Sequence, residues 1–334
     1  MTRQPRWQQA SRRPRALVLA PFRGPAASRL GEIADVVQDS WLDHQPPRIS
    51  QPADLAARLA SEQADILITE ADPVTGPVLE QDLAIIGVTR GDPVNVDLPA
   101  ATGRGIPVLC TPGRNADAVA ELVVAMLFAV TRHVLAADRE VRAGTVYDGG
   151  QLPQVRHRSW ELAGKTAGLV GLGAVGRAVR WRLQGLGMRV IACDPAVADA
   201  TCSLSELLAQ SDVVSIHVPA SAQTAGMIGA GEFAAMRTGA IYLNTARAGL
   251  HDSGALVSAL RSGQLAGAAL DHFEGEWLDP GDPLAALPNV VLTPHIGGAT
   301  YDTEVNHTTM IVSDIERLLG GEQPLHCANP EVLG

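Results

Sequence analysis

The sequence predicts an α/β protein with two Rossmann-like or flavodoxin-like lobes, one of them inserted into the other. Three observations predict this class. Short apolar runs alternate with helix-compatible stretches along most of the 334 residues, a pattern typical of parallel sheets covered by helices. A glycine-rich turn with the spacing GxGxxG occupies residues 171–176. Strand-like runs precede that unit and a long helical stretch follows it, so the middle domain is expected to interrupt the first.

The first lobe is predicted to span residues 1–112, with residues 1–14 expected to be disordered. The first 15 residues carry five arginines and no acid, and they lack the apolar core of a secretory signal. A helix is predicted at 53–63. Strands are predicted at residues 16–20, 33–37, 65–69, 83–89 and 107–111.

The middle domain is predicted to span residues 113–300, and residues 301–334 are predicted to return to the first lobe. Residues 115–144 show one long helical pattern with acids early and a glycine at its end, which suits a helix crossing between domains. A loop is expected at 145–158 and a last helix at 302–319. Six strands are predicted at residues 167–170, 190–193, 213–218, 240–245, 266–270 and 290–293.

The glycine turn and its flanks predict a dinucleotide site. Gly171 allows a tight turn, Gly173 lets the backbone approach a pyrophosphate, and Gly176 lets the helix pack closely on the strand. Asp194, after the second strand, can accept hydrogen bonds from ribose hydroxyls. No arginine or lysine occurs among the five residues that follow it, which favours NAD over NADP. A ligand-free glycine turn is the alternative for the bare motif.

Three residues just after later strands could carry chemistry: Arg247, Glu276 and His295. The carboxyl ends of parallel strands meet at one edge of a sheet, where a dinucleotide places its reactive ring. An imidazole titrates near neutral pH and suits an acid, a carboxylate can orient it, and a guanidinium can bind a carboxylate. Taken singly, each is more often a surface group or a structural residue; together they indicate a site.

Composition excludes other classes of function. The formal net charge is −10 and aromatic residues are 4% of the chain, so neither phosphate neutralisation nor base stacking by a nucleic-acid partner is expected. Four scattered cysteines without metal-binding spacing favour a reducing cytoplasm. The sequence contains no run of 18 apolar residues, so no membrane span is predicted. No metal site is predicted.

The chain resembles the D-isomer-specific 2-hydroxyacid dehydrogenases, the family of phosphoglycerate dehydrogenase and hydroxypyruvate reductase. The matching stretches cover most of residues 105–300 in family order, whereas the N-terminal sheet matches in pattern only. They are VAELVVAMLFAVTR (119–132), GKTAGLVGLGAVGRAV (164–179), SIHVPASAQTAGMI (215–228), NTARAG (244–249), AGAALDHFEGE (266–276) and LPNVVLTPHIGGAT (287–300).

The resemblance implies an NAD-dependent oxidoreductase that moves a hydride between NAD(H) and a D-2-hydroxy acid or its 2-oxo partner. It implies that His295 is the general acid and base, that Glu276 orients it, and that Arg247 binds the substrate carboxylate and carbonyl. It also implies a homodimer, and substrate binding by Arg90, Gly91, Asp92 and Asn115. The implied cofactor-binding residues are Gly171, Gly173, Ala174, Val175, Gly176, Asp194, His217, Val218, Pro219, Thr224, Thr245, Ala246, Asp271, Gly297 and Gly298.

Departures from the family pattern concern the substrate rather than the chemistry. His272 stands where the family usually has Val or Ile, Trp277 where it often has Pro, and the loop 90–95 reads RGDPVN. His272 is expected to fill space or to titrate beside the catalytic residues. The residues leave a different class open, namely an NAD(H)-sensing, corepressor-like binding protein on the same fold.

Overall fold

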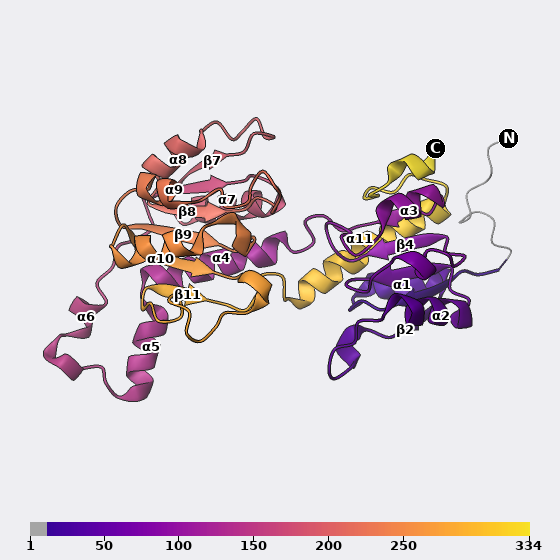
Figure 1. The fold of residues 1–334 in the computed structure, drawn as a ribbon, viewed down its shortest axis with the longest axis horizontal. Coiled ribbons are helices and arrows are strands. Elements are labelled where there is room, and N and C mark those ends of the chain that lie inside the picture. Colours follow the sequence, from indigo (N-terminus) through magenta and orange to yellow (C-terminus); the bar gives the residue numbers. More distant parts are fainter. Residues whose placement is uncertain (1–11) are drawn as a thin grey trace. The chain divides into compact units, whose positions relative to one another are not determined.

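The computed structural model describes residues 12–334, and the chain folds into two compact units. The first contains the described residues up to Arg114 together with Thr300–Gly334, and the second is Asn115–Ala299. Each unit is a parallel sheet flanked by helices (Figure 1), so the predicted α/β class is confirmed. Of the disorder predicted for residues 1–14, positions 1–11 lie outside the described residues.

The first unit has a five-stranded parallel sheet in the order β2-β1-β3-β4-β5, the flavodoxin-like order. Its strands are β1 (Arg15–Val18), β2 (Asp35–Gln38), β3 (Ile66–Thr69), β4 (Ile85–Val88) and β5 (Val108–Leu109). Its helices are α1 (Pro25–Ile33), α2 (Pro52–Glu62), α3 (Leu98–Gly103) and α11 (Tyr301–Leu319), with 3-10 turns at Trp41–Asp43, Gly76–Val78 and Pro330–Leu333.

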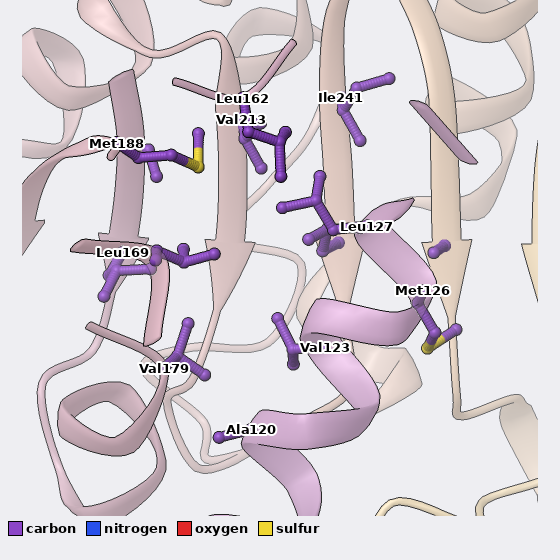
Figure 2. Packing of buried hydrophobic residues seen from close by; sticks show 14 of the residues in the cluster. Ala120, Val123, Met126, Leu127, Leu162, Leu169, Val179, Met188, Val213 and Ile241 are labelled. Carbon is purple, nitrogen blue, oxygen red and sulfur yellow. The ribbon is translucent and has the colours of Figure 1, made fainter. Parts of the chain in front are cut away.

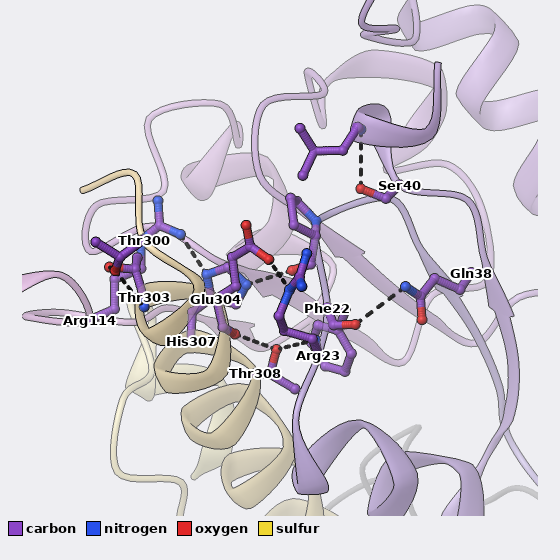
Figure 3. Close-up of polar contacts among 12 residues, drawn as sticks. Phe22, Arg23, Gln38, Ser40, Arg114, Thr300, Thr303, Glu304, His307 and Thr308 are labelled. Atoms are coloured by element: carbon purple, nitrogen blue, oxygen red, sulfur yellow. Dashed lines mark hydrogen bonds and ion pairs between the residues drawn. The ribbon is translucent and has the colours of Figure 1, made fainter. Parts of the chain in front are cut away.

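Both faces of this sheet are buried, because alternate strand residues enter two separate clusters. Leu17 and Leu67 pack with α2 on one face, whereas Ile68 packs with Ile311 of α11 on the other. The first turn of α11 is held by Thr300, whose hydroxyl accepts from the N–H of Thr303 at 3.1 Å. Figure 3 shows this turn beside polar contacts of the same unit. The returning helix is therefore built into the core of the first unit.

The buried side chain of His307 also fixes α11 within the first unit. Its Nδ1 lies 2.6 Å from Nη1 of Arg114 (Figure 3), and its Nε2 lies 2.6 Å from the carbonyl oxygen of Pro21. A guanidinium only donates, so Nδ1 accepts and Nε2–H donates to Pro21. Arg114 also reaches Glu70 at 2.5 Å. This network fixes Arg114, the last residue before the second unit begins.

The second unit has a six-stranded parallel sheet in the order β11-β10-β9-β8-β6-β7, which confirms the six predicted strands. They are β6 (Thr166–Val170), β7 (Arg189–Cys193), β8 (Val213–Ile216), β9 (Ala240–Asn244), β10 (Leu265–Leu270) and β11 (Val290–Leu292). Its helices are α4 (Ala116–Thr131), α5 (Val134–Ala143), α6 (Pro153–Arg156), α7 (Ala174–Gly185), α8 (Leu204–Gln210), α9 (Ala230–Ala235) and α10 (Ser253–Arg261), with 3-10 turns at Asp148–Gly150, Ala248–Leu250 and Glu274–Glu276.

Helices cover both faces of this sheet as well. Val123 and Leu127 of α4 point at Leu169, Val213 and Ile241 of the strands (Figure 2). The opposite face packs against α8, α9 and α10 through a cluster that includes Phe233, Tyr242 and Leu256. Both faces of the sheet are thus apolar, so polar side chains that could bind or act on a ligand lie at the ends of the strands.

The prediction of one helix over residues 115–144 is wrong. α4 ends at Thr131, α5 begins at Val134, and the two are bent by 62°. His133 between them has a φ of 53°, a left-handed conformation that stops helical hydrogen bonding. The predicted loop at 145–158 also contains the short helix α6.

Within the described residues, no single helix is long and apolar enough to cross a membrane. The bent pair of α4 and α5 passes that test by length and composition together. α4 belongs to the core of the second unit, where Val123, Met126 and Leu127 are buried.

Candidate active site

All six strands of the second unit are parallel, so their carboxyl ends form one edge of the sheet. Candidate functional residues follow each of the six strands along this edge. In the order of the sheet, they are His295 after β11, Asp271 and Glu276 after β10, Arg247 after β9, His217 after β8, the glycine turn after β6 and Asp194 after β7.

The glycine turn connects β6 to α7, and two of its glycines are sterically required. Gly171 has a φ of +96°, and a Cβ there would lie 2.6 Å from the carbonyl oxygen of His217. A Cβ on Gly176 would lie 2.2 Å from the carbonyl oxygen of Gly171. At Gly173, the N-cap residue of α7, an added Cβ would have no atom within 4 Å. Open space therefore lies beside the N-terminus of α7, where the first N–H groups, including those of Ala174 and Val175, lack partners within the helix.

Asp194 is half-buried at the end of β7 and fixed by backbone donors. Its Oδ2 accepts from the N–H of Leu172 at 2.7 Å, and its Oδ1 accepts from Ala196 at 2.9 Å. The first bond ties the carboxylate to the glycine turn. Each oxygen keeps a lone pair for a further donor.

The ends of β8 and β9 carry buried polar atoms without a protein partner among residues 12–334. They are Nδ1 of His217 and Oγ1 of Thr245. His217 is bonded at Nε2 to Ser215 at 2.9 Å, and burial lowers its pKa to about 4. Buried polar atoms in folded proteins are nearly always satisfied, so these two are available to a ligand. Val218, Pro219 and Ala246 lie next to them in the chain.

Thr224 lies further along the loop after β8. Its hydroxyl donates to the carbonyl oxygen of Pro219 at 2.7 Å and accepts from the N–H of Ser221 at 2.8 Å. The side chain therefore braces its own loop.

Arg247 follows β9 and is exposed. Asn244 holds the backbone there, because its amide donates to the carbonyl oxygen of Arg247 at 2.8 Å and accepts from the N–H of Ala246 at 3.0 Å. The guanidinium donates to the carbonyl oxygen of Ala246 at 2.6 Å and lies 3.4 Å from Nε2 of His272. Its remaining donors are free to bind an anion.

Glu276 and His295 form the central pair. Nδ1 of His295 lies 2.9 Å from Oε1 of Glu276. A carboxylate accepts here, so Nδ1 carries the proton and Nε2 is the free ring atom. Both residues have left-handed backbones, with φ values of 59° and 55°. Such conformations are uncommon for non-glycine residues and cluster at functional sites, and sequence patterns do not reveal them.

His272 lies among these three residues and is 5% exposed. Its ring centroid is 3.7 Å from that of His295, and its Nδ1 is 3.9 Å from Oε1 of Glu276. Burial lowers its pKa to about 4, helped by the nearby charges of His295 and Arg247. Among the described residues, one group of side chains has ligand atoms close enough together to hold a metal ion. It consists of His272, Glu276 and His295.

Asp271 is fully buried and braces the segment that carries His295. Its Oδ1 accepts from the hydroxyl of Thr293 at 2.6 Å and from the N–H of Ile296 at 2.9 Å, and its Oδ2 accepts from the N–H of Gly297 at 2.8 Å. Sequence reasoning missed this role, because the donors lie more than 20 residues further along the chain.

Two glycines beyond His295 leave room for polar neighbours. A Cβ on Gly297 would lie 3.0 Å from Oδ2 of Asp271, and one on Gly298 would lie 2.9 Å from Nδ2 of Asn115. Packing alone therefore explains both glycines. Asn115 is half-buried at the start of α4.

The predicted substrate residues of the first unit lie in the loop after β4. Arg90 is half-buried, whereas Gly91 and Asp92 are exposed. The N–H of Thr111 donates to the carbonyl oxygen of Arg90 at 2.7 Å. This bond ties the loop to the end of β5.

Comparison with known proteins identifies the same family that the motifs suggest. The model of the D-isomer specific 2-hydroxyacid dehydrogenase, NAD binding domain, matches residues 124–297. Those residues include the glycine turn and all three of Arg247, Glu276 and His295.

Relatives match over nearly the full chain. A glyoxylate reductase from Thermofilum pendens is 36% identical over 96% of both chains. The crystal structure of the TT0316 protein from Thermus thermophilus has a TM-score of 0.79 and 37% identity, covering 94% of this chain and 99% of that one. An NADPH-dependent glyoxylate/hydroxypyruvate reductase from Sinorhizobium meliloti, solved with NADP and malonate, has a TM-score of 0.72 and 26% identity, covering 96% and 98%.

Proposed function

The chain belongs to the D-isomer specific 2-hydroxyacid dehydrogenase family, and we propose that it transfers a hydride between NAD(H) and a D-2-hydroxy acid or its 2-oxo partner. The observation that carries the proposal is the Glu276–His295 bond of 2.9 Å at the strand ends, with Arg247 beside it. This set supplies a proton donor, a group that orients it, and a cation for a carboxylate.

The residues of the second unit fit a dinucleotide. The space before α7 suits a pyrophosphate, because helix N-termini offer free N–H groups and a favourable dipole. The unpartnered atoms of His217 and Thr245 offer further polar contacts. When bound, NADH would supply the hydride for the carbonyl carbon of a 2-oxo acid.

The proton chemistry follows from the tautomer of His295. Because Nδ1–H is directed at Glu276, Nε2 is the atom that would donate a proton to the carbonyl oxygen of the substrate. The carboxylate of Glu276 stabilises the imidazolium before that transfer. In the reverse direction, Nε2 accepts the proton from the hydroxyl of the 2-hydroxy acid.

Arg247 is proposed to bind the carboxylate and to polarise the carbonyl with its planar set of donors. Arg90, Gly91, Asp92 and Asn115 are proposed to contact the substrate. Trp277, which is 71% exposed beside Glu276, is proposed to influence which side chain is accepted. Small unphosphorylated acids such as glyoxylate or hydroxypyruvate are favoured, because the loop 90–95 offers a single cation for a phosphate.

We favour NAD over NADP. A 2′-phosphate near Asp194 would face a carboxylate, and residues 195–199 contain no cation. Arg180 lies near that segment, but its Nη1 is 3.8 Å from the carboxylate of Asp199. Relatives include an NADPH-dependent enzyme, and a comparison of the Kd for NADH with that for NADPH tests the preference.

A homodimer is proposed from an apolar surface outside the sheet. Figure 1 shows α5 and α6 projecting away from the body of the second unit. Large apolar side chains are exposed along this arm, defined as residues 134–155. They are Val134, Leu135, Val141, Tyr147, Leu152 and Val155. Clustered exposure of this kind marks interaction sites. A cytoplasmic location stays a prediction.

The decisive experiment is a screen of 2-oxo acids, with and without a terminal phosphate, for oxidation of NADH and of NADPH. Turnover with a small 2-oxo acid and preference for NADH are expected. His295→Ala should lower kcat by at least about 100-fold while NADH affinity changes little, because the general acid is lost and the cofactor contacts remain. NADH binding without turnover of any acid would instead favour an NAD(H)-sensing binding protein.

A further inference from the structure

His272 contacts all three proposed catalytic residues and has no role in the reaction described above. Its Nε2 is 3.4 Å from Nη1 of Arg247, its Nδ1 is 3.9 Å from Oε1 of Glu276, and its ring lies 3.7 Å from the ring of His295. A polar ring that is 5% exposed is costly to bury unless its polar atoms are matched.

The neighbours of His272 select one tautomer. A guanidinium has only donors, so its contact with Nε2 is attractive only if Nε2 carries a lone pair. The single proton of a neutral ring then resides on Nδ1, which faces the carboxylate of Glu276. Arg247, Glu276, His295 and Asp271 are the charged or titratable groups that act on this ring. A second proton at Nε2 would be directed at Arg247, and the two cations would repel each other.

We propose that His272 is a positioning residue, a neutral, Nδ1-protonated imidazole that accepts a hydrogen bond from Arg247 while its ring supports that of His295. The inference rests on the proposed function and goes beyond it, since it joins the carboxylate-binding arginine to the proton donor through one buried side chain. Its consequence is a restrained Arg247, which would otherwise be an exposed and mobile side chain.

The same tautomer argues against a metal at this place. An ion held by His272, Glu276 and His295 through their nearest atoms would need the lone pair of Nδ1 on His272. That would leave the proton on Nε2 against Arg247. The geometry therefore favours a metal-free positioning role for His272. A measurement of zinc binding tests the alternative, in which these side chains hold a metal.

The experiment compares two variants of the full chain. His272→Phe keeps a ring against His295 but has no acceptor, whereas His272→Gln keeps an acceptor at a similar reach but has no ring. Loss of one hydrogen bond to a charged group is expected to raise the KM for the 2-oxo acid, and the Kd for oxamate in the NADH complex, by about 5-fold or more in His272→Phe. His272→Gln should recover most of that loss. The Kd for NADH should stay within about 2-fold in both variants.

The outcomes separate the two proposals. An active wild type with unchanged KM and oxamate affinity in His272→Phe would overturn the role of His272 alone. A wild type without turnover on any acid would count against the proposed function. The tautomer is tested independently of turnover by ¹⁵N NMR of histidine-labelled protein, with the His272 signal identified by its loss in His272→Gln. A doubly protonated ring at pH 7, an Nε2-protonated ring, or stoichiometric zinc binding that requires His272 would each overturn the inference.

Discussion

Asp271 shows how one buried carboxylate can fix the segment that carries His295. It accepts three hydrogen bonds, from Thr293, Ile296 and Gly297, on both sides of His295. These bonds hold the left-handed backbone at His295, which would otherwise relax to a common conformation. We assign Asp271 to the support of this segment, and its role in cofactor binding stays a prediction.

Asp271→Asn is expected to lower kcat/KM by about 10- to 100-fold and the free energy of unfolding by about 1–3 kcal/mol. The amide NH2 would replace one acceptor and face a donor from Ile296, Thr293 or Gly297, which leaves a buried group unsatisfied. Steady-state kinetics and denaturant titration measure both effects. Glu274→Gln, the same chemical change at an exposed site in the next turn, is the control. Equal losses in the two variants would contradict the supporting role.

Candidate site residues could be predicted from the sequence only where their position along the chain reveals them. Arg247, Glu276 and His295 were predicted because each follows a strand at the same edge of the sheet, and their catalytic roles stay predictions. The pairing of His272 with Arg247 could not, since the partners are 25 residues apart and depend on the register of β9 and β10. The hydroxyl of Thr224 is bonded within its own loop, and the predicted role of Thr224 in cofactor binding stays a prediction.

At the scale of elements, two glycines of the β6–α7 connection are expected to serve different purposes. Gly176 is needed for folding and Gly173 for cofactor binding. Gly176→Ala is expected to destabilise the fold by about 1–3 kcal/mol, because overpacking forces the backbone to shift. Its Cβ would meet the carbonyl oxygen of Gly171 at 2.2 Å. Gly173→Ala should leave the unfolding free energy within about 0.5 kcal/mol, since nothing lies within 4 Å of its Cβ.

The variants Gly176→Ala and Gly173→Ala also test the proposed pyrophosphate site. Gly173→Ala should weaken NADH binding by about 10-fold or more, because the methyl group would occupy the space through which the phosphates approach α7. Fluorescence titration with NADH and thermal melts measure the two properties side by side. A stable Gly173→Ala variant with wild-type NADH affinity would place the dinucleotide elsewhere.

The elements themselves were largely predictable from apolar runs, because both sheets are buried on two faces. The main error in the predicted elements was the missed break between α4 and α5. The segment Thr131-Arg132-His133-Val134 contains neither glycine nor proline, and the left-handed residue is His133. Tertiary packing of α4 against the sheet therefore sets this end of the helix, and local sequence does not mark it.

At the scale of the whole molecule, buried histidines predict sensitivity to acid. Burial lowers the pKa values of His217, His251 and His307 from 6.5 to about 4. Between those values the unfolded chain binds more protons than the folded one, so stability falls as pH falls. The slope approaches about 1.4 kcal/mol per pH unit for each group.

Denaturant or thermal unfolding between pH 6.5 and 5 checks this expectation, since most carboxylates are still ionised in that window. In His251→Gln, the free energy of unfolding should depend less steeply on pH than in the wild type. The difference in slope should correspond to at most one proton bound on unfolding. Constant or rising stability from pH 6.5 to 5 would contradict the neutral, buried state of these rings.

The apolar arm, residues 134–155, predicts the assembly. Leu152 and Val155 are 60% and 46% exposed, and a second copy of the chain would remove them from water at about 25 cal/mol per Å². The double substitution Leu152→Asp and Val155→Asp adds charge to that surface and should convert a dimer into a monomer, measured by light scattering. Ile49→Asp, at a residue of the first unit that is 54% exposed, should leave the mass unchanged. A wild type that is monomeric at micromolar concentration, or a double variant that stays dimeric, would show that the arm is no interface.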